Sequence, residues 1–140
     1  MDNDSGLQMR FYETGPDEVT AEYEVPDRYQ GYPGVVHGGI VAAMLDEVAG
    51  RAQMGDDPPR FMYTARLNIR YRKHVPTDEL LRIVGRIDKR RGRTTIATGV
   101  IYGPEGELLA EAEALLVDMP SDVLQSTDLD ALGWQVYEEG

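Results

Sequence analysis

One segment of this sequence, residues 40–54, has helical periodicity, and it stands alone among segments that are predicted to be strands. Its apolar residues recur every three or four positions and form one broad face; they are Ile40, Val41, Met44, Leu45 and Val48. A cluster of Gly, Asp and Pro over residues 55–59 ends it. Because no second helix is predicted, this apolar face has to be buried against a sheet.

Extended segments lie on both sides of the helix. Residues 11–12 and 19–25 precede it, followed by a loop rich in Gly and Tyr over 26–36. Four more strands are predicted over residues 61–72, 80–88, 94–102 and 108–118. In the first of these, alternation places Ala65, Leu67, Ile69 and Tyr71 on one face and Arg66, Asn68, Arg70 and Arg72 on the other. We expect a two-layer α+β domain whose last four strands form an antiparallel meander.

The 140 residues are enough for one domain with one core. We expect this domain to span residues 1–120, and the acidic residues 121–140 to form a peripheral tail with Trp134 and Tyr137 as candidate anchors. No apolar run reaches the ~18 residues that span a bilayer, and the N-terminal residues lack the pattern of a secretory signal. We therefore expect a soluble, cytoplasmic protein with no membrane partner.

The formal net charge of −11 argues against general binding of nucleic acid. The charge is segregated, however, because residues 66–93 hold ten basic and three acidic residues, a local excess of +7 that leaves −18 on the remainder. This stretch is either a solvated strand face of mixed charge or a basic patch for a phosphorylated ligand. A tight turn at Arg91-Gly92-Arg93 joins two of the strands within it.

The residues His37-Gly38-Gly39 come directly before the helix, and two glycines at a helix start leave backbone N–H groups uncovered. Such a terminus attracts negative oxygen. Asp46 follows eight residues after Gly38 and has no cation at helical spacing, whereas Glu47 has Arg51 four residues on. Asp46 is therefore either an ordinary helical aspartate or the carboxylate of an acyl-transfer site.

Helical geometry separates Gly38 and Asp46 by about 12 Å, whereas attack requires reacting atoms about 3–3.5 Å apart. Two copies of the helix packed antiparallel about a two-fold axis would bring Asp46 of one copy to the Gly38 end of the other. A stripe of small residues, Ala42, Ala49 and Gly50, would permit that approach. We therefore predict a dimer with shared sites.

Residues 37–46, His-Gly-Gly-Ile-Val-Ala-Ala-Met-Leu-Asp, resemble the start of the helix in hotdog-fold acyl-CoA thioesterases of the phenylacetate-pathway and 4-hydroxybenzoyl-CoA type. The resemblance covers roughly residues 10 to 118. It implies a long central helix wrapped by an antiparallel sheet of five to six strands. It also implies hydrolysis of an acyl-CoA to free acid and CoA by a homodimer or a dimer of dimers, with no cofactor besides the thioester substrate.

By this resemblance, Asp46 is the nucleophile or the general base for water, and the Gly38 N–H polarises the thioester carbonyl. His37 orients the loop or the substrate, or else is a structural cap. Thr64 matches a Ser or Thr that relatives place near the carboxylate, although alternation puts it on the charged face with Arg66.

Relatives often carry Asn or Gln six residues before the His, and here that position is Gly31, next to Gln30. A one-residue shift of the loop would let Gln30 serve instead. Candidates for binding CoA are Arg90, Arg91, Arg93 and Gly39, with Arg72 and Lys73 as a second choice. The walls around the acyl group are expected to include Tyr32, Met44, Val48, Phe61 and Tyr63.

Two other classes of function stay open. The chain could be a hotdog dehydratase or hydratase. It could also be a non-catalytic module that binds acyl-CoA or another small ligand, because Gly31 stands where relatives often carry Asn or Gln. No metal site is expected, since there is no cysteine and the histidines are His37 and His74. A serine triad is not expected either, because neither histidine has a serine in a nucleophile-elbow setting.

Overall fold

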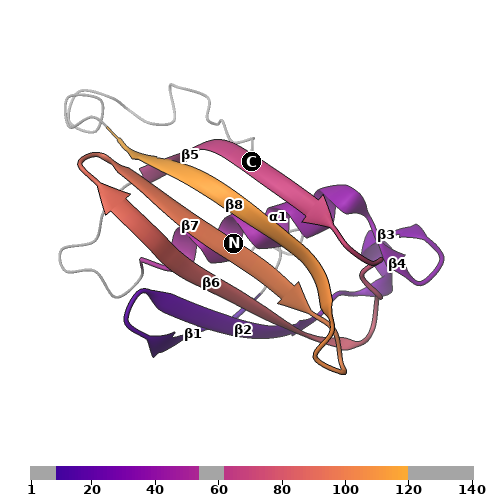
Figure 1. Cartoon of the computed structure of the whole chain (residues 1–140). Helices are drawn as coiled ribbons and strands as arrows, with labels where there is room; N and C mark the ends of the chain where they lie inside the picture. Colours follow the sequence, from indigo (N-terminus) through magenta and orange to yellow (C-terminus); the bar gives the residue numbers. More distant parts are fainter. Residues whose placement is uncertain (1–8, 54–61, 120–140) are drawn as a thin grey trace, which may run out of the picture.

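The computed structural model describes residues 9–53 and 62–119. In this part of the chain one α-helix, α1 (Gly38–Arg51), lies against a sheet of six antiparallel strands (Figure 1). The strands are β1 (Phe11–Gly15), β2 (Glu18–Glu24), β5 (Met62–Tyr71), β6 (Leu80–Arg91), β7 (Thr94–Tyr102) and β8 (Leu108–Asp118). The predicted α+β architecture is confirmed. The predicted boundary at residue 120, the tail and Phe61 fall outside the described residues.

Residues 26–36, predicted to be a loop, contain a short 3-10 turn, η1 (Asp27–Tyr29), and a small hairpin of β3 (Gln30–Tyr32) and β4 (Val35–Val36). This hairpin projects past the end of the main sheet, beside the start of α1 (Figure 1). No helix in the described part of the chain is both long enough and apolar enough to cross a membrane.

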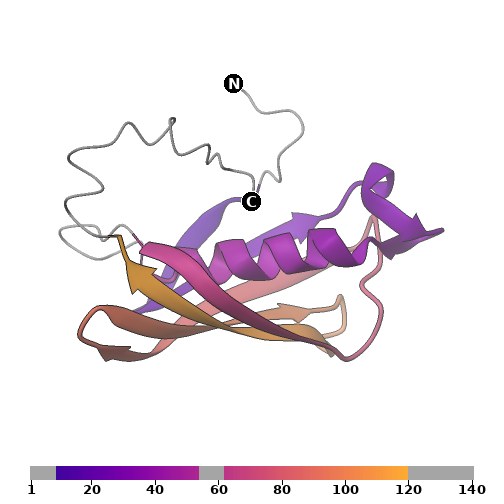
Figure 2. The same ribbon diagram turned by 90° about the horizontal axis from the view of Figure 1, so that it is seen from above.

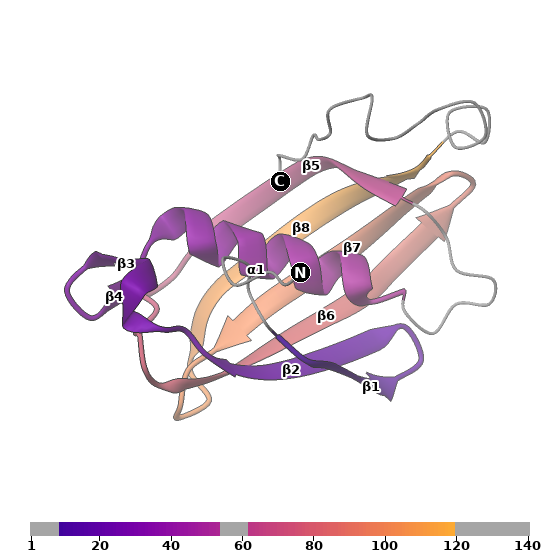
Figure 3. The same ribbon diagram turned by 180° about the vertical axis from the view of Figure 1, so that it is seen from behind.

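The strand order is β1-β2-β6-β7-β8-β5, so the predicted four-strand meander is wrong in one respect. Strands β6, β7 and β8 do follow one another, but β5 pairs with β8 at the far edge. The eight residues between β5 and β6 span up to ~26 Å, enough to cross the ~14 Å of three strand spacings. Figure 3 shows the result, with β5 on one side of α1 and the β1–β2 hairpin on the other.

The sheet curves around α1, which lies in its concave face (Figure 2). Two glycines lie directly beneath the helix and bring the two backbones together. A Cβ on Gly85 would be 2.1 Å from the carbonyl oxygen of Val48, and one on Gly99 would be 2.8 Å from that of Leu45. The helix therefore rests on β6 and β7, and this contact fixes the height of Asp46 above the sheet.

Because the sheet wraps the helix, it buries residues that the sequence analysis had placed elsewhere. Ala49, predicted to lie on a contact stripe between subunits, is fully buried against Ala97, Ala114 and Leu116 of its own sheet. Met44 and Val48, predicted as walls of an acyl tunnel, are fully buried in the core, whereas Tyr32 and Tyr63 are exposed. The exposed small residues of the helix are Gly38, Gly39, Ala43 and Gly50.

Candidate active site

The start of α1 is held by a network of backbone hydrogen bonds. Val36 N–H donates to the carbonyl of Val75 (2.7 Å), and His37 N–H donates to that of Tyr29 (2.8 Å). Thr77 N–H donates in turn to the carbonyl of Gly34 (3.1 Å). These bonds tie the hairpin before the helix to the connection after β5, so His37 enters the helix from a fixed position.

His37 is the N-cap of α1. Its Nδ1 accepts a hydrogen bond from the Gly39 N–H (2.9 Å), and its carbonyl accepts from Ile40 and Val41 (3.0 and 3.1 Å). The structure thus shows the capping interaction, and an additional role in orienting substrate stays a prediction. Of the N–H groups of residues 37–41, that of Gly38 is the one to which the described residues offer no acceptor. The exposed Gly38 N–H is therefore available to an oxygen of a ligand.

The hairpin gives Gln30 a structural contact. Its Oε1 accepts a hydrogen bond from the N–H of Gly34 (3.0 Å), a residue whose φ of +78° suits glycine. Position 31, where relatives carry Asn or Gln, faces the N-cap, because a Cβ on Gly31 would be 3.4 Å from the Cα of His37. The contribution of Gln30 to a reaction stays a prediction.

The structure brings Asp46 and Thr64 together. The Thr64 hydroxyl donates to Oδ1 of Asp46 (2.7 Å), although the two residues are 18 positions apart in the chain. Asp46 is half-buried, and no group among the described residues bonds to its second oxygen. The predicted ion pair of Glu47 with Arg51 is confirmed at 3.2 Å, so this arginine is not directed at Asp46.

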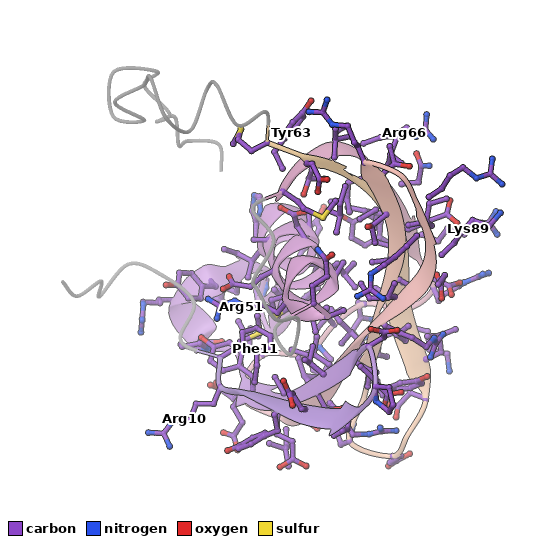
Figure 4. The ribbon with its side chains drawn as sticks, turned by 90° about the vertical axis from the view of Figure 1, so that its left-hand side faces the viewer. Arg10, Phe11, Arg51, Tyr63, Arg66 and Lys89 are labelled. Atoms are coloured by element: carbon purple, nitrogen blue, oxygen red, sulfur yellow. The ribbon has the colours of Figure 1, made fainter. Side chains whose placement is uncertain are left out.

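Thr64 reaches the helix because β5 contains a β-bulge. The register against β8 shifts between Thr64, which pairs with Leu116, and Arg66, which pairs with Leu115, so that Ala65 is an extra residue. The prediction that Thr64 shares a face with Arg66 is therefore wrong, because strict alternation ignores the bulge. Figure 4 shows Arg66 directed away from the helix, on the outer side of the sheet.

The basic turn between β6 and β7 lies at the same end of the sheet as the Asp46–Thr64 pair. Thr64, Leu116, Thr95 and Arg90 are successive cross-strand neighbours. Arg90 forms an ion pair with Asp17 (3.0 Å). Arg91 and Arg93 are exposed and have no ion pair with any described residue.

The other residues predicted to bind CoA are placed differently. The Gly39 N–H is used by the cap, and Arg72 donates from Nε to Glu111 (2.9 Å). Lys73 is exposed and lines a hollow of about 290 Å³ at the start of the helix. Of these candidates, Arg91, Arg93 and Lys73 thus have charged groups that are not engaged by described residues.

The sequence analysis missed one residue of the site. Tyr71, predicted as a member of an apolar face, donates a hydrogen bond from its hydroxyl to the carbonyl of Gly38 (3.0 Å). A tyrosine at the end of an amphipathic strand carries no signal that its hydroxyl meets a helix start 33 residues away.

The sequence model of the thioesterase superfamily matches residues 33–110, more than half of the chain and the segment that contains the N-cap, Asp46, Thr64 and Tyr71. The chain belongs to the thioesterase superfamily. It is 27% identical over 113 residues to the rat acyl-coenzyme A thioesterase THEM4, covering 80% of this chain and 48% of the rat protein. The mouse THEM4 is 32% identical over 91 residues, 64% of this chain and 38% of that protein. The chain thus spans about half or less of these curated relatives.

Solved structures agree with this membership. A thioesterase superfamily protein of known crystal structure is 30% identical with a TM-score of 0.71, and the match covers 78% of this chain and 55% of that one. A hypothetical thioesterase of Streptococcus pneumoniae, crystallised with coenzyme A, shares the fold at 20% identity and a TM-score of 0.72, covering 80% and 86% of the two chains. The predicted hotdog arrangement, a long helix wrapped by an antiparallel sheet, is confirmed.

Proposed function

We propose that this protein hydrolyses acyl-CoA thioesters to a free acid and CoA. The observation that carries the proposal is the arrangement of two groups on one helix. Thr64 binds one carboxylate oxygen of Asp46 and leaves the other oxygen open, and the first turn of the same helix offers the unengaged Gly38 N–H. Support comes from the family and from relatives named acyl-coenzyme A thioesterases. The Streptococcus pneumoniae thioesterase is known with bound coenzyme A and in mutant forms in which an aspartate or a threonine is replaced by alanine.

In this reaction the Gly38 N–H donates to the thioester oxygen as negative charge develops on it. The open oxygen of Asp46 either attacks the carbonyl carbon or removes a proton from the water that does so. The carbon–sulfur bond breaks and CoA leaves as the thiolate. In the first case, water then hydrolyses the mixed anhydride. Thr64 keeps the carboxylate in a single orientation.

The two halves of this site come from different chains. Gly38 and Asp46 of one helix are separated by about 12 Å, so neither half is sufficient alone. We infer a homodimer in which two copies of α1 run antiparallel and each Asp46 meets the partner's Gly38. Gly39, Ala43 and Gly50 are small and exposed, and they permit a close approach of the two helices. Association of two dimers and a cytoplasmic location remain predictions.

The nucleotide of CoA is negatively charged, and Arg91 and Arg93 form an exposed pair at the same end of the sheet as Thr64, with no ion-pair partner among the described residues. We assign the phosphates to this turn. Arginine suits phosphate because its planar fork donates two parallel hydrogen bonds.

The experiment is thiol release from acyl-CoAs of short, long and aromatic acyl groups by the wild type and by Asp46→Asn. We expect the variant to lose at least ~100-fold in kcat while still binding CoA in calorimetry. The control is Glu47→Gln, since the neighbouring carboxylate is paired with Arg51 and should be dispensable. An Asp46→Asn variant with wild-type turnover would refute the proposal. Binding without turnover would favour the binding module, and reaction at a double bond without thiol release would favour a hydratase.

A further inference from the structure

Tyr71 is the last residue of β5, and its hydroxyl donates to the carbonyl of Gly38 at 3.0 Å although the side chain is 55% exposed. A Cβ on Gly38 would be 3.7 Å from the tyrosine oxygen, so the phenol lies directly against the residue that supplies the free N–H. Both residues line the hollow of about 290 Å³ at this end of the helix. The contact is thus at the position where a ligand reaches the first turn.

A helix start that contains Gly38 and Gly39 needs an anchor of this kind. Glycine is less favourable in a helix than alanine, because it loses more backbone freedom when it is ordered. The cap of His37 restrains Gly39, and the described residues offer nothing but Tyr71 to hold the carbonyl of Gly38 from outside the helix. The carbonyl and the N–H of Gly38 lie in two peptide planes that meet at its Cα, so holding the carbonyl restrains the rotation of this glycine about φ and ψ and, through it, the direction of the N–H.

Strand β5 therefore contacts the helix at two functional points. Thr64 holds Asp46, and Tyr71 holds Gly38, with the strand and the helix running in opposite directions. In the dimer inferred above, the Gly38 of one chain works with the Asp46 of the other. The two contacts made by one β5 then serve two different sites.

We propose that Tyr71 is a positioning residue for the oxyanion donor, and that it acts in the site completed by Asp46 and Thr64 of the partner subunit. This inference rests on the proposed function. Loss of the hydroxyl leaves the fold and the carboxylate in place but allows the Gly38 N–H to rotate away from the developing oxyanion. The loss therefore appears in the chemical step and not in substrate binding.

The first test compares Tyr71→Phe with Tyr12→Phe, which removes a hydroxyl of similar exposure (58%) from the opposite edge of the sheet. We expect Tyr71→Phe to lower kcat ~10-fold with KM changed less than ~2-fold, because misplacement of a catalytic donor acts on the transition state. Tyr12→Phe should match the wild type, and all three proteins should show the same unfolding temperature. A wild-type kcat in Tyr71→Phe would overturn the proposal.

The second test uses mixed dimers, purified through two different tags, of a chain with Asp46→Asn and a chain with Tyr71→Phe. If Tyr71 serves the partner's carboxylate, one site of this dimer is intact, and its rate should equal that of a mixed dimer of the wild type with Asp46→Asn. If Tyr71 serves the carboxylate of its own chain, the rate stays ~10-fold lower, and the assignment across the dimer is wrong. The Asp46→Asn homodimer separates the two claims, because its activity would refute the proposed function itself.

Discussion

Placing a methyl group at Gly85 should push the helix off the sheet and damage both stability and activity. The Cβ would lie 2.1 Å from the carbonyl oxygen of Val48 and 2.7 Å from the carbonyl carbon, whereas ordinary contact begins near 3.4 Å. The helix would have to rise by roughly 1.3 Å, and rotation of a side chain cannot relieve the clash, because the two nearest atoms are backbone. Overpacking of this kind costs about 3 kcal/mol, the upper part of the usual range.

For a chain of this size, such a loss should lower the unfolding temperature by ~10 °C. The same rise would carry Asp46 away from Thr64, lengthening a 2.7 Å hydrogen bond beyond its working range and lowering kcat by ~100-fold. The assays are denaturant unfolding and thiol release below the unfolding transition. Gly15→Ala is the matched control, because nothing lies within 4 Å of its Cβ. A Gly85→Ala protein within ~0.5 kcal/mol of the wild type would refute the reasoning.

Three further sets of substitutions test individual contacts. Thr64→Val removes the hydroxyl that holds the helix carboxylate and should lower kcat by ~10- to 100-fold, whereas Thr64→Ser should retain most of the activity; equal rates of thiol release would contradict a role for the hydroxyl. His37→Ala should lower the free energy of unfolding by ~1 kcal/mol, and His37→Asn should restore it, since asparagine also caps helices. If His37→Asn restores the stability but not the wild-type kcat, the imidazole does more than cap the helix. Replacing both Arg91 and Arg93 with Gln should raise the KM for acyl-CoA by ~10-fold at constant kcat, and added salt should reduce this effect. Arg70→Gln is the control. An equal rise in the KM of the control would show a nonspecific effect of charge.

The parts of the structure that the sequence predicted depend on neighbours in the chain. The ion pair of Glu47 with Arg51 spans four positions. The helix covers most of the predicted range 40–54, but it begins earlier, at Gly38, and ends earlier, at Arg51. Strands β7 and β8 begin and end at the predicted residues, because the turns at Arg91-Gly92-Arg93 and Gly103-Pro104-Glu105-Gly106 mark where they start and stop. These features follow from helical and strand geometry, and tertiary packing did not override them.

The predictions failed where the alternation of apolar and polar residues does not reveal which strands pair or where a strand bulges. Alternation says which residues of β5 face the core but not which strand lies beside it, so the pairing of β5 with β8 was not predictable from the pattern. The bulge has no sequence mark either, since Ala65 is an ordinary strand residue without the glycine that marks some bulges. Ala49 was misplaced because a curved sheet covers more of the helix than a flat one would.

Strand β5 contacts both halves of the candidate site through residues that are far from the helix in the sequence. Thr64 meets Asp46 across 18 positions, and Tyr71 meets Gly38 across 33, and in the folded protein both contacts are made by the strand that pairs with β8. The register of that ladder, with one extra residue at Ala65, decides that a hydroxyl and not a neighbouring side chain reaches the carboxylate. The chemistry of the helix could therefore be anticipated from ten consecutive residues, whereas its orientation depends on the order of strands across the whole sheet.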